Sequence, residues 1–348
     1  MKKVFFTPGP TELFFTYADH FRRAMKDQVG SISHRSVEFE NIFQHTTAQI
    51  GQLLNLPSSY RVIFASSATE IWERSAQNLI TETSHHFVHG SFGKKFHQVA
   101  KNWEKETQLT EIENEFEPTK SKADFIALTM NETSTGFQHH ADDLAAMRKL
   151  NPDAIISLDI VSSVPGLSVD FGQIDSAFLS VQKCFGMPAG LGVWMVNDRA
   201  IDVANGIDHE SYHSLPSLIR NANKNQTPST PNVLNIYLLG KIAEDMNRRG
   251  MKAIQVETNY KAALLYQTLA SHPSFELAIS NKRHRSKTTI VANCRNGNEK
   301  ILHYLGAKGM IIGEGYADQK GSQIRIANFP AHSKEQVELL CDTLEKFA

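Results

Sequence analysis

An aspartate and a lysine, each at the end of an apolar run, are the residues of this chain best suited to chemistry. Asp159 ends the run AIISLD (154–159), and Lys183 ends the run SAFLSVQK (176–183). Both runs have the length and composition of short buried β-strands. Ligands of open α/β sheets bind at the carboxyl ends of the strands, so we expect the two side chains to meet at one site.

An acid and an amine delivered to one sheet edge predict a cofactor that is held at two points. A lysine near apolar surface has a lowered pKa, and its neutral amine can form a Schiff base with an aldehyde. A carboxylate can keep the nitrogen of a pyridine ring protonated, so that the ring withdraws electrons from the substrate. Lys183 and Asp159 therefore indicate pyridoxal 5'-phosphate (PLP) as the cofactor.

Strand and helix patterns alternate around these two residues. Further strand patterns occur at 61–65, 86–89, 124–130 and 190–197. The alternation predicts an α/β fold with a mainly parallel sheet and helices on both faces. Residues 205–231 are polar and predicted to be irregular, whereas 232–269 have a helical pattern with a break at Arg248-Arg249-Gly250. The tail, 275–347, is predicted to form a small α/β domain.

Composition and charge exclude several other classes of protein. The chain has 348 residues, 41% of them hydrophobic, and a net charge of −1, which predicts a soluble two-domain enzyme without a nucleic-acid or membrane surface. Three scattered cysteines fit a reducing compartment, and no apolar run has the length of a signal peptide or membrane span. We therefore expect a cytoplasmic protein. The histidine pairs at 85–86 and 139–140 lack metal-ligand spacing, so no metal site is predicted.

Short motifs across the chain resemble the class V (fold type I) PLP-dependent aminotransferases, most of all the phosphoserine aminotransferases. The motifs, in the family's order, are TPGPTEL (7–13), ISHRSVEF (32–39), LNLPSSYRVIF (54–64), NET (131–133), AGLGV (189–193) and TPSTPN (227–232). The resemblance implies a large PLP-binding domain at 15–250 with a seven-stranded, mainly parallel sheet. It also implies a small C-terminal domain at 251–348 that includes residues 1–14, and a homodimer with shared active sites.

The resemblance also implies roles for individual residues. Lys183 would bind the cofactor and carry the proton, Asp159 would pair with the pyridine nitrogen, and Thr133 would approach the ring oxygen. The residues implied at the cofactor phosphate are Ala68, Thr69, Gln182 and, from the neighbouring subunit, Thr227. Phe92 would stack on the ring, although a core aromatic is an equal alternative for this position.

Two sets of basic residues would bind the substrate. Arg325, in SQIRIANF, matches the family's α-carboxylate arginine, and it should point away from Ile324 and Ile326 because strand residues alternate. His34 and Arg35 match the pair for the distal anionic group. Where the family carries a further His-Arg pair, this chain has EGYADQKGSQIR, in which Lys320 offers the positive charge.

Together these features predict a phosphoserine:2-oxoglutarate aminotransferase of serine biosynthesis, with ping-pong kinetics through pyridoxamine phosphate. Its substrates would be small amino and 2-oxo acids. An alanine– or serine–glyoxylate (pyruvate) aminotransferase of the same class is the alternative. A cysteine desulfurase is less favoured, because Cys294 ends an apolar strand pattern and Gln182 precedes the lysine. A PLP-binding protein without catalysis stays open, since fold does not guarantee activity.

Overall fold

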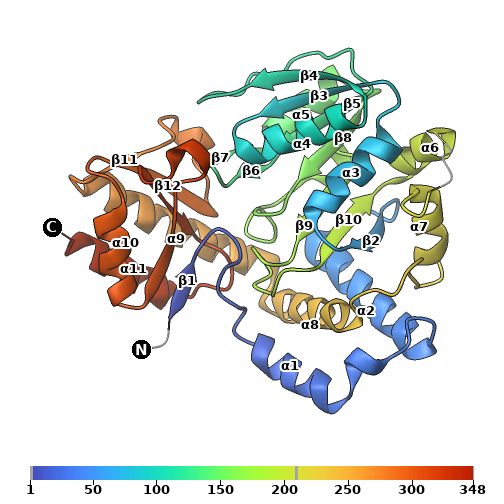
Figure 1. Cartoon of the computed structure of the whole chain (residues 1–348), viewed down its shortest axis with the longest axis horizontal. Coiled ribbons are helices and arrows are strands. Elements are labelled where there is room, and N and C mark those ends of the chain that lie inside the picture. Colours follow the sequence, from blue (N-terminus) through green and yellow to red (C-terminus); the bar gives the residue numbers. More distant parts are fainter. Residues whose placement is uncertain (1–2, 208–210, 348) are drawn as a thin grey trace.

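A seven-stranded and a five-stranded sheet organise the computed structural model, which describes residues 3–207 and 211–347 (Figure 1). The seven-stranded sheet has the order β2 (Arg61–Ala65), β10 (Gly192–Val196), β9 (Ser176–Ser180), β8 (Ile155–Asp159), β5 (Phe125–Thr129), β3 (Thr83–Val88) and β4 (Glu106–Glu111). β10 is antiparallel to both of its neighbours, and the other pairs are parallel. The predicted α/β fold with a mainly parallel seven-stranded sheet is therefore confirmed.

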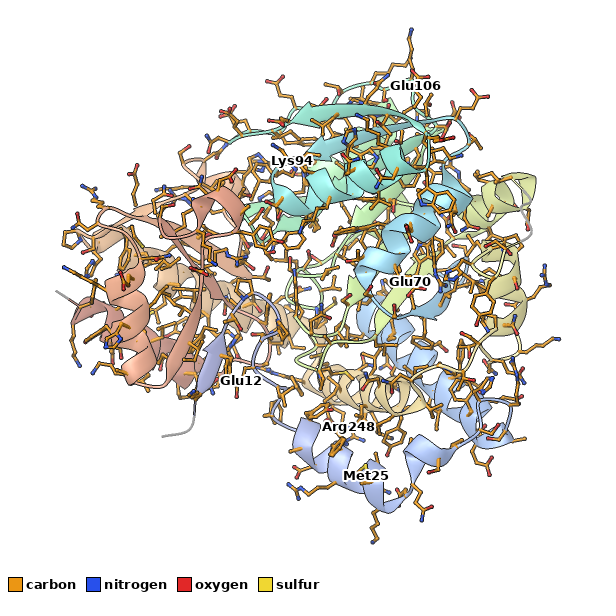
Figure 2. The ribbon with its side chains drawn as sticks, viewed as in Figure 1. Glu12, Met25, Glu70, Lys94, Glu106 and Arg248 are labelled. Carbon is orange, nitrogen blue, oxygen red and sulfur yellow. The ribbon has the colours of Figure 1, made fainter. Side chains whose placement is uncertain are left out.

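Helices cover both faces of the large sheet. One face packs against α2 (Val37–Leu54), α5 (Ala141–Leu150) and α8 (Val233–Arg249), and the other against α3 (Ala68–Leu79), α4 (Ser91–Asn102), α6 (Asp198–Ile207) and α7 (Leu215–Ala222). The side chains of successive strand residues point alternately into the two cores. In β5, Ile126 and Leu128 lie in the first core, and Phe125 and Ala127 in the second. Figure 2 shows side chains filling the space between the sheet and its helices.

Two features of the large sheet's surroundings differ from the sequence predictions. Residues 205–231 are not irregular throughout, because α7 begins at the Ser214 cap, whose hydroxyl accepts a hydrogen bond from the Ser217 N–H. Leu215, Leu218 and Ile219 are the buried residues of this helix, and they are interspersed with polar positions. Strand β4 was also missed, because the edge sequence ETQLTE is largely exposed and has no apolar pattern.

The predicted helix break at Arg248-Arg249-Gly250 is confirmed. α8 ends at Arg249, and α9 (Met251–Ser271) begins directly after Gly250. Gly250 has a φ of +84°, a backbone conformation that glycine adopts without steric cost.

The five-stranded sheet joins the two ends of the chain. Its order is β1 (Val4–Phe6), β13 (Met310–Glu314), β14 (Gln323–Ala327), β12 (Thr289–Cys294) and β11 (Phe275–Leu277). α9, α10 (Glu299–Ala307) and α11 (Lys334–Glu345) share its core. Figure 1 shows the blue strand β1 beside the red C-terminal strands. The domain boundaries at 14/15 and 250/251 stay predictions.

The remaining elements are short. They are α1 (Tyr17–Lys26), the ribbon of β6 (Asn131–Glu132) and β7 (Phe137–Gln138), and the 3-10 turns η1 (Val29–Ser31), η2 (Phe171–Gln173), η3 (Lys282–His284) and η4 (Ala317–Gln319). Within residues 3–207 and 211–347, no helix is both long and apolar enough to cross a membrane.

Candidate active site

The parallel strands β5, β8 and β9 end at the same edge of the large sheet, and the predicted reactive residues follow there. Asp159 is the last residue of β8, Lys183 follows β9 after a short turn, and Thr133 follows β5. All three side chains line one cavity. Its full lining is Ser67, Ala68, Thr69, Trp72, Phe92, Thr129, Asn131, Thr133, Asp159, Val161, Ser162, Ser180, Gln182 and Lys183.

Lys183 lies at the wall of this cavity with only 9% of its surface exposed. Its Nζ atom is 3.4 Å from Thr133 Oγ1. Burial lowers the pKa of the amine, and the negative charges of Asp159 and Glu132 oppose that shift. The lowered pKa increases the neutral fraction of the amine, which is the form that attacks a carbonyl carbon.

Gly9 makes room for the lysine. A β-carbon at Gly9 would lie 3.0 Å from both Cγ and Cε of Lys183, and the φ of +127° also favours glycine. The same N-terminal segment holds the backbone next to the lysine, because the Thr11 N–H donates to the Gln182 carbonyl at 3.2 Å. The TPGP motif therefore shapes the wall on which the lysine lies.

Asp159 is buried at the end of β8, and the Val161 N–H donates to its Oδ1 atom at 2.9 Å. Burial raises the pKa of its carboxyl group to about 7, although the hydrogen bond from Val161 and the charge of Lys183 act in the opposite direction. A carboxyl group with this pKa is ready to share a proton with a ring nitrogen.

The N-terminus of α3 forms another wall of the cavity. Ser67 caps the helix by accepting the Glu70 N–H at 3.1 Å, and Ala68 and Thr69 form its first turn. The Ala68 N–H donates to Ser180 Oγ at 2.7 Å, which fixes the helix end to β9. A helix N-terminus carries partial positive charge and binds phosphate groups.

Phe92 lies at the start of α4, and its ring is part of the cavity wall. Lys183 Nζ is 4.9 Å from the ring centroid. Glu132 fixes the helix start by accepting the N–H groups of Phe92 and Gly93. The ring therefore faces the position that a planar cofactor bound to Lys183 would occupy, while its edge also packs against the second core.

Arg325 joins the site from the small sheet. Its Nη1 donates to the Thr133 carbonyl at 3.2 Å, and its Nε donates to the Glu314 carbonyl at 2.7 Å. Ile324 and Ile326 point into the core of the small sheet, so the alternation expected from the sequence is present. The guanidinium group is thus aimed at the cavity edge beside Thr133.

His34, Arg35 and Thr227 are not in this cavity. Arg35 and Thr227 form a separate patch together with His34, which precedes Arg35 in the chain. Arg35 Nη1 donates to the Thr227 carbonyl at 2.8 Å and to Gln226 Oε1 at 3.1 Å. Arg35 Nη2 also donates to the carbonyl of Pro228 at 3.3 Å. Within one chain, the structure therefore separates the predicted distal-anion pair from the predicted lysine.

Three polar atoms of the cavity test whether PLP fits, and two of them belong to residues, Trp72 and Asn131, that were not predicted from the sequence. Trp72 Nε1, Asn131 Oδ1 and Gln182 Oε1 are buried and have no hydrogen-bond partner within the described part of the chain. Buried polar atoms without partners are costly, so these three are available to a polar ligand. Together with the helix N-terminus, the buried carboxyl and the amine, they fit the phosphate, ring and aldehyde of PLP. The NET motif contains Asn131, whereas nothing in the helical pattern distinguished Trp72.

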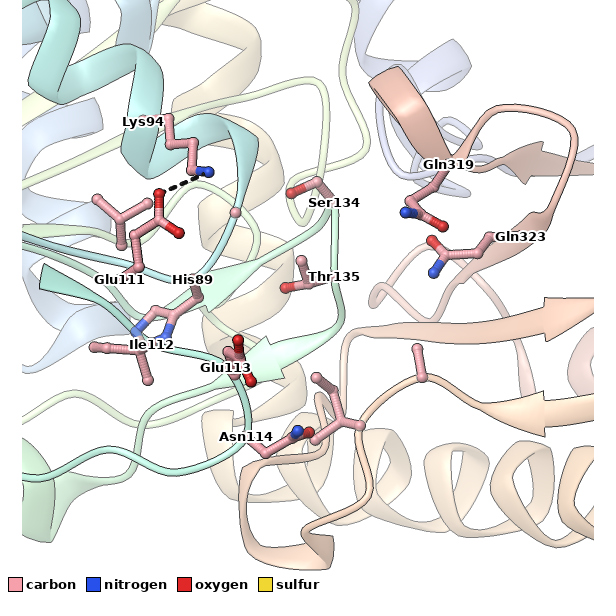
Figure 3. Close-up of a pocket in the computed structure, with 14 residues that line it drawn as sticks. His89, Lys94, Glu111, Ile112, Glu113, Asn114, Ser134, Thr135, Gln319 and Gln323 are labelled. Atoms are coloured by element: carbon pink, nitrogen blue, oxygen red, sulfur yellow. Dashed lines mark ion pairs between the residues drawn. The ribbon is translucent and has the colours of Figure 1, made fainter.

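A second cavity contains none of the predicted site residues (Figure 3). Figure 3 shows Ser134 and Thr135 on one side of it and Gln319 and Gln323 on the other. Ser134 and Thr135 lie in the turn between β6 and β7, whereas Gln319 lies in η4 and Gln323 begins β14 of the small sheet, so residues of both parts of the chain line this cavity.

Comparisons with known proteins agree with this geometry. The family model of the class V aminotransferases matches residues 6–340. A crystal structure of a phosphoserine aminotransferase from Cytophaga hutchinsonii is 44% identical, with a TM-score of 0.97 and coverage of 99% of each chain. The phosphoserine aminotransferase of a Nocardioides species is 26% identical over 98% of this chain and 94% of that protein.

More distant structures share the fold alone. An alanine–glyoxylate aminotransferase from a Nostoc species is 16% identical, with a TM-score of 0.85 over 100% of this chain and 95% of that one. The family match covers nearly the whole chain and includes every residue of the cavity. This chain therefore belongs to the class V aminotransferases and is a PLP-dependent transaminase.

Proposed function

We propose that this transaminase is a phosphoserine:2-oxoglutarate aminotransferase. L-glutamate would give its amino group to the enzyme and leave as 2-oxoglutarate, and 3-phosphohydroxypyruvate would then take the amino group to become phosphoserine. The observation that carries the proposal is that Lys183 and Asp159 line one cavity while Arg325 donates to the carbonyl of Thr133 at its edge. It occurs in a chain that is 44% identical, over 99% of its length, to a protein named phosphoserine aminotransferase.

The cofactor, when bound, supplies an aldehyde that accepts the amino group and a ring that withdraws electrons from the substrate Cα. Lys183 would hold the cofactor through its neutral amine, and the same amine would move the proton between the substrate Cα and the former aldehyde carbon of the cofactor. Its place beside Thr133 and Phe92 keeps the amine at the cavity wall, where burial excludes water. Asp159 holds a proton at its carboxyl group and shares it with the ring nitrogen.

The first turn of α3 and Gln182 would bind the cofactor phosphate. The positive end of the helix at Ala68 and Thr69 favours an anion, and the Gln182 carboxamide, whose NH2 group can donate to a phosphate oxygen, lies in the same cavity. Phe92 would cover the ring on one face. Thr133 would contact the ring oxygen from its position 3.4 Å from the lysine nitrogen.

Arg325 would bind the α-carboxylate of every substrate. Two of its nitrogens donate to the carbonyls of Thr133 and Glu314, which orients the planar guanidinium and leaves Nη2 without a protein partner among the described residues. An oriented guanidinium matches a carboxylate better than a flexible ammonium would. This interaction is independent of the substrate side chain.

The patch of His34, Arg35 and Thr227 supports a homodimer with shared active sites. The Arg35 guanidinium donates to the Thr227 carbonyl, His34 precedes Arg35 in the chain, and none of the three residues lines the cavity of its own chain. A two-fold dimer offers the patch of each chain to the cavity of the other. Thr227 would then bind the partner's cofactor phosphate, and His34 and Arg35 the distal anionic group of its substrate.

Other parts of the proposal follow the same reasoning. The domains would divide at 14/15 and 250/251, and the enzyme would act in the cytoplasm. A sulfur-carrying role for Cys294 is disfavoured, because this residue lies in β12 and burial raises the pKa of its thiol to about 11.

The first half-reaction tests this proposal. Purified holoenzyme is mixed with L-glutamate, and both the cofactor absorbance and the 2-oxoglutarate formed are followed. We expect about one 2-oxoglutarate per active site, because no acceptor is present. Lys183→Ala, checked for folding by thermal unfolding, should form none. A wild-type enzyme that binds PLP but leaves glutamate unchanged would refute the proposal.

A further inference from the structure

Lys95 lies one helical turn after Phe92 on α4 and carries a positive charge to the edge of the active site. Its Nζ atom donates to the Tyr316 hydroxyl at 2.6 Å. The same nitrogen is 5.5 Å from the Phe92 ring centroid and 5.0 Å from the Tyr316 ring centroid. Lys95 therefore connects α4, which covers the large sheet, to the segment between β13 and η4 of the small sheet.

Tyr316 lies next to both Lys95 and Arg325, the arginine proposed to bind the α-carboxylate of the substrate. Its ring is tilted against Phe92 at a centroid distance of 5.1 Å, and Arg325 Cζ is 5.3 Å from its centroid. Lys183 Nζ, in turn, is 4.9 Å from the Phe92 centroid. Two lysines and one arginine, Lys183 among them, thus lie around one pair of tilted aromatic rings.

The backbone around Tyr316 is fixed by close packing. A β-carbon at Gly315 would lie 1.9 Å from the Gln319 carbonyl oxygen, so this turn has no room for a side chain. The Gly315 N–H donates to the Gln323 carbonyl at 2.8 Å, and the Gln319 N–H donates to the Tyr316 carbonyl at 3.0 Å. The phenol is consequently held in a defined position.

Lys95 differs from the lysines around it in having a neutral partner. Lys94, the preceding residue, pairs with Glu111 at 2.9 Å (Figure 3), and Lys320 pairs with Glu314 at 3.5 Å. Lys95 makes no ion pair with any described carboxylate and donates to a phenol instead. An exposed ammonium group that is positioned but not neutralised attracts an anionic ligand.

We propose that Lys95, positioned by Tyr316, is a further residue that binds the distal anionic group of the substrate, in addition to the His34 and Arg35 that a second subunit would supply. Arg325 and Lys95 lie at the same Tyr316 ring and are therefore suited to the two ends of a dianionic amino acid. The α-carboxylate binds Arg325, and the phosphate of phosphoserine or the γ-carboxylate of glutamate binds Lys95. This inference rests on the proposed function and names a residue of the cavity's own chain that favours an anionic side chain over a neutral one.

The test uses holoenzyme and the rate of the half-reaction as a function of phosphoserine concentration. Lys95→Gln should raise the half-saturating concentration about tenfold, because one charge-assisted contact is lost, and should leave the maximal rate within about twofold. Tyr316→Phe should raise the half-saturating concentration of phosphoserine by a smaller factor, about threefold, because the Lys95 ammonium loses its hydrogen bond to the phenol but keeps its charge. Lys94→Gln is the matched control on the same helix and should change nothing.

Serine provides the comparison substrate because it lacks the distal charge. The rate constant for serine should be the same in wild type and Lys95→Gln. Equal losses for serine and phosphoserine, an unchanged half-saturating concentration for phosphoserine, or an effect confined to the maximal rate would each overturn the inference. A wild-type enzyme that converts serine but not phosphoserine would instead refute the proposed function, so the two failures are distinguishable.

Discussion

Replacing Asp159 with asparagine should stabilise the cofactor-free enzyme at alkaline pH. The carboxyl group is buried, and its pKa is raised from 3.8 to about 7 in the folded chain. The folded chain therefore binds this proton more strongly than the unfolded chain does. The contribution of the Asp159 carboxyl group to the free energy of unfolding is fully present below pH 3.8 and is lost as the pH rises to about 7.

The size of the effect follows from the pKa difference. A shift of about three pH units corresponds to about 4 kcal/mol at most. Asparagine stays neutral, and its side-chain oxygen can still accept the Val161 N–H that Asp159 accepts at 2.9 Å. At pH 8.5 we expect Asp159→Asn to be more stable than wild type by roughly 3 kcal/mol, with a smaller difference at pH 5.

Urea unfolding of the cofactor-free proteins at both pH values measures this difference. Asp175→Asn is the contrasting control, because that buried aspartate forms an ion pair with Arg148 and accepts the Ile156 N–H at 2.9 Å. Its replacement should destabilise the enzyme. Adding PLP should stabilise wild type more than Asp159→Asn, because only the carboxylate can pair with the ring nitrogen. A stability difference for Asp159→Asn that does not change with pH would refute the reasoning.

Three further predictions concern the site. Arg325→Lys should raise the half-saturating concentrations of glutamate and phosphoserine, measured by saturation kinetics, by a similar factor of about tenfold or more, because both substrates lose the same bidentate contact. Phe92→Ala should weaken PLP binding, measured by absorbance titration, by about tenfold through loss of ring stacking, and unchanged binding would exclude the stacking role. Mixing Lys183→Ala with Arg35→Ala subunits should restore about a quarter of wild-type activity if the sites are shared, because half of the randomly formed dimers have one intact site; no recovery after subunit exchange would contradict sharing.

The strand ends of the site could be predicted because local patterns determine them. A short apolar run that ends in a polar residue identifies Asp159, and the alternation of Ile324, Arg325 and Ile326 gives the direction of the arginine. The sequence also indicated the break at Gly250. These features depend on residues that are near one another in the chain.

Other features depend on contacts that no local pattern records. Lys95 and Tyr316 are 221 positions apart, and only the packing of the two sheets brings them together. The fit of Gly9 against Lys183 is a contact of the same kind. Strand β4 escaped prediction for another reason: at the sheet edge, ladder hydrogen bonds hold a mostly exposed polar sequence.

The most direct test of the account is the choice of amino acceptor by the holoenzyme. With saturating L-glutamate, the rate of 2-oxoglutarate formation is measured against 3-phosphohydroxypyruvate, pyruvate and glyoxylate in turn. We predict that kcat/KM for 3-phosphohydroxypyruvate exceeds the values for the other two by at least about 100-fold, because only this acceptor carries a distal anion. A higher kcat/KM for pyruvate or glyoxylate would contradict the account.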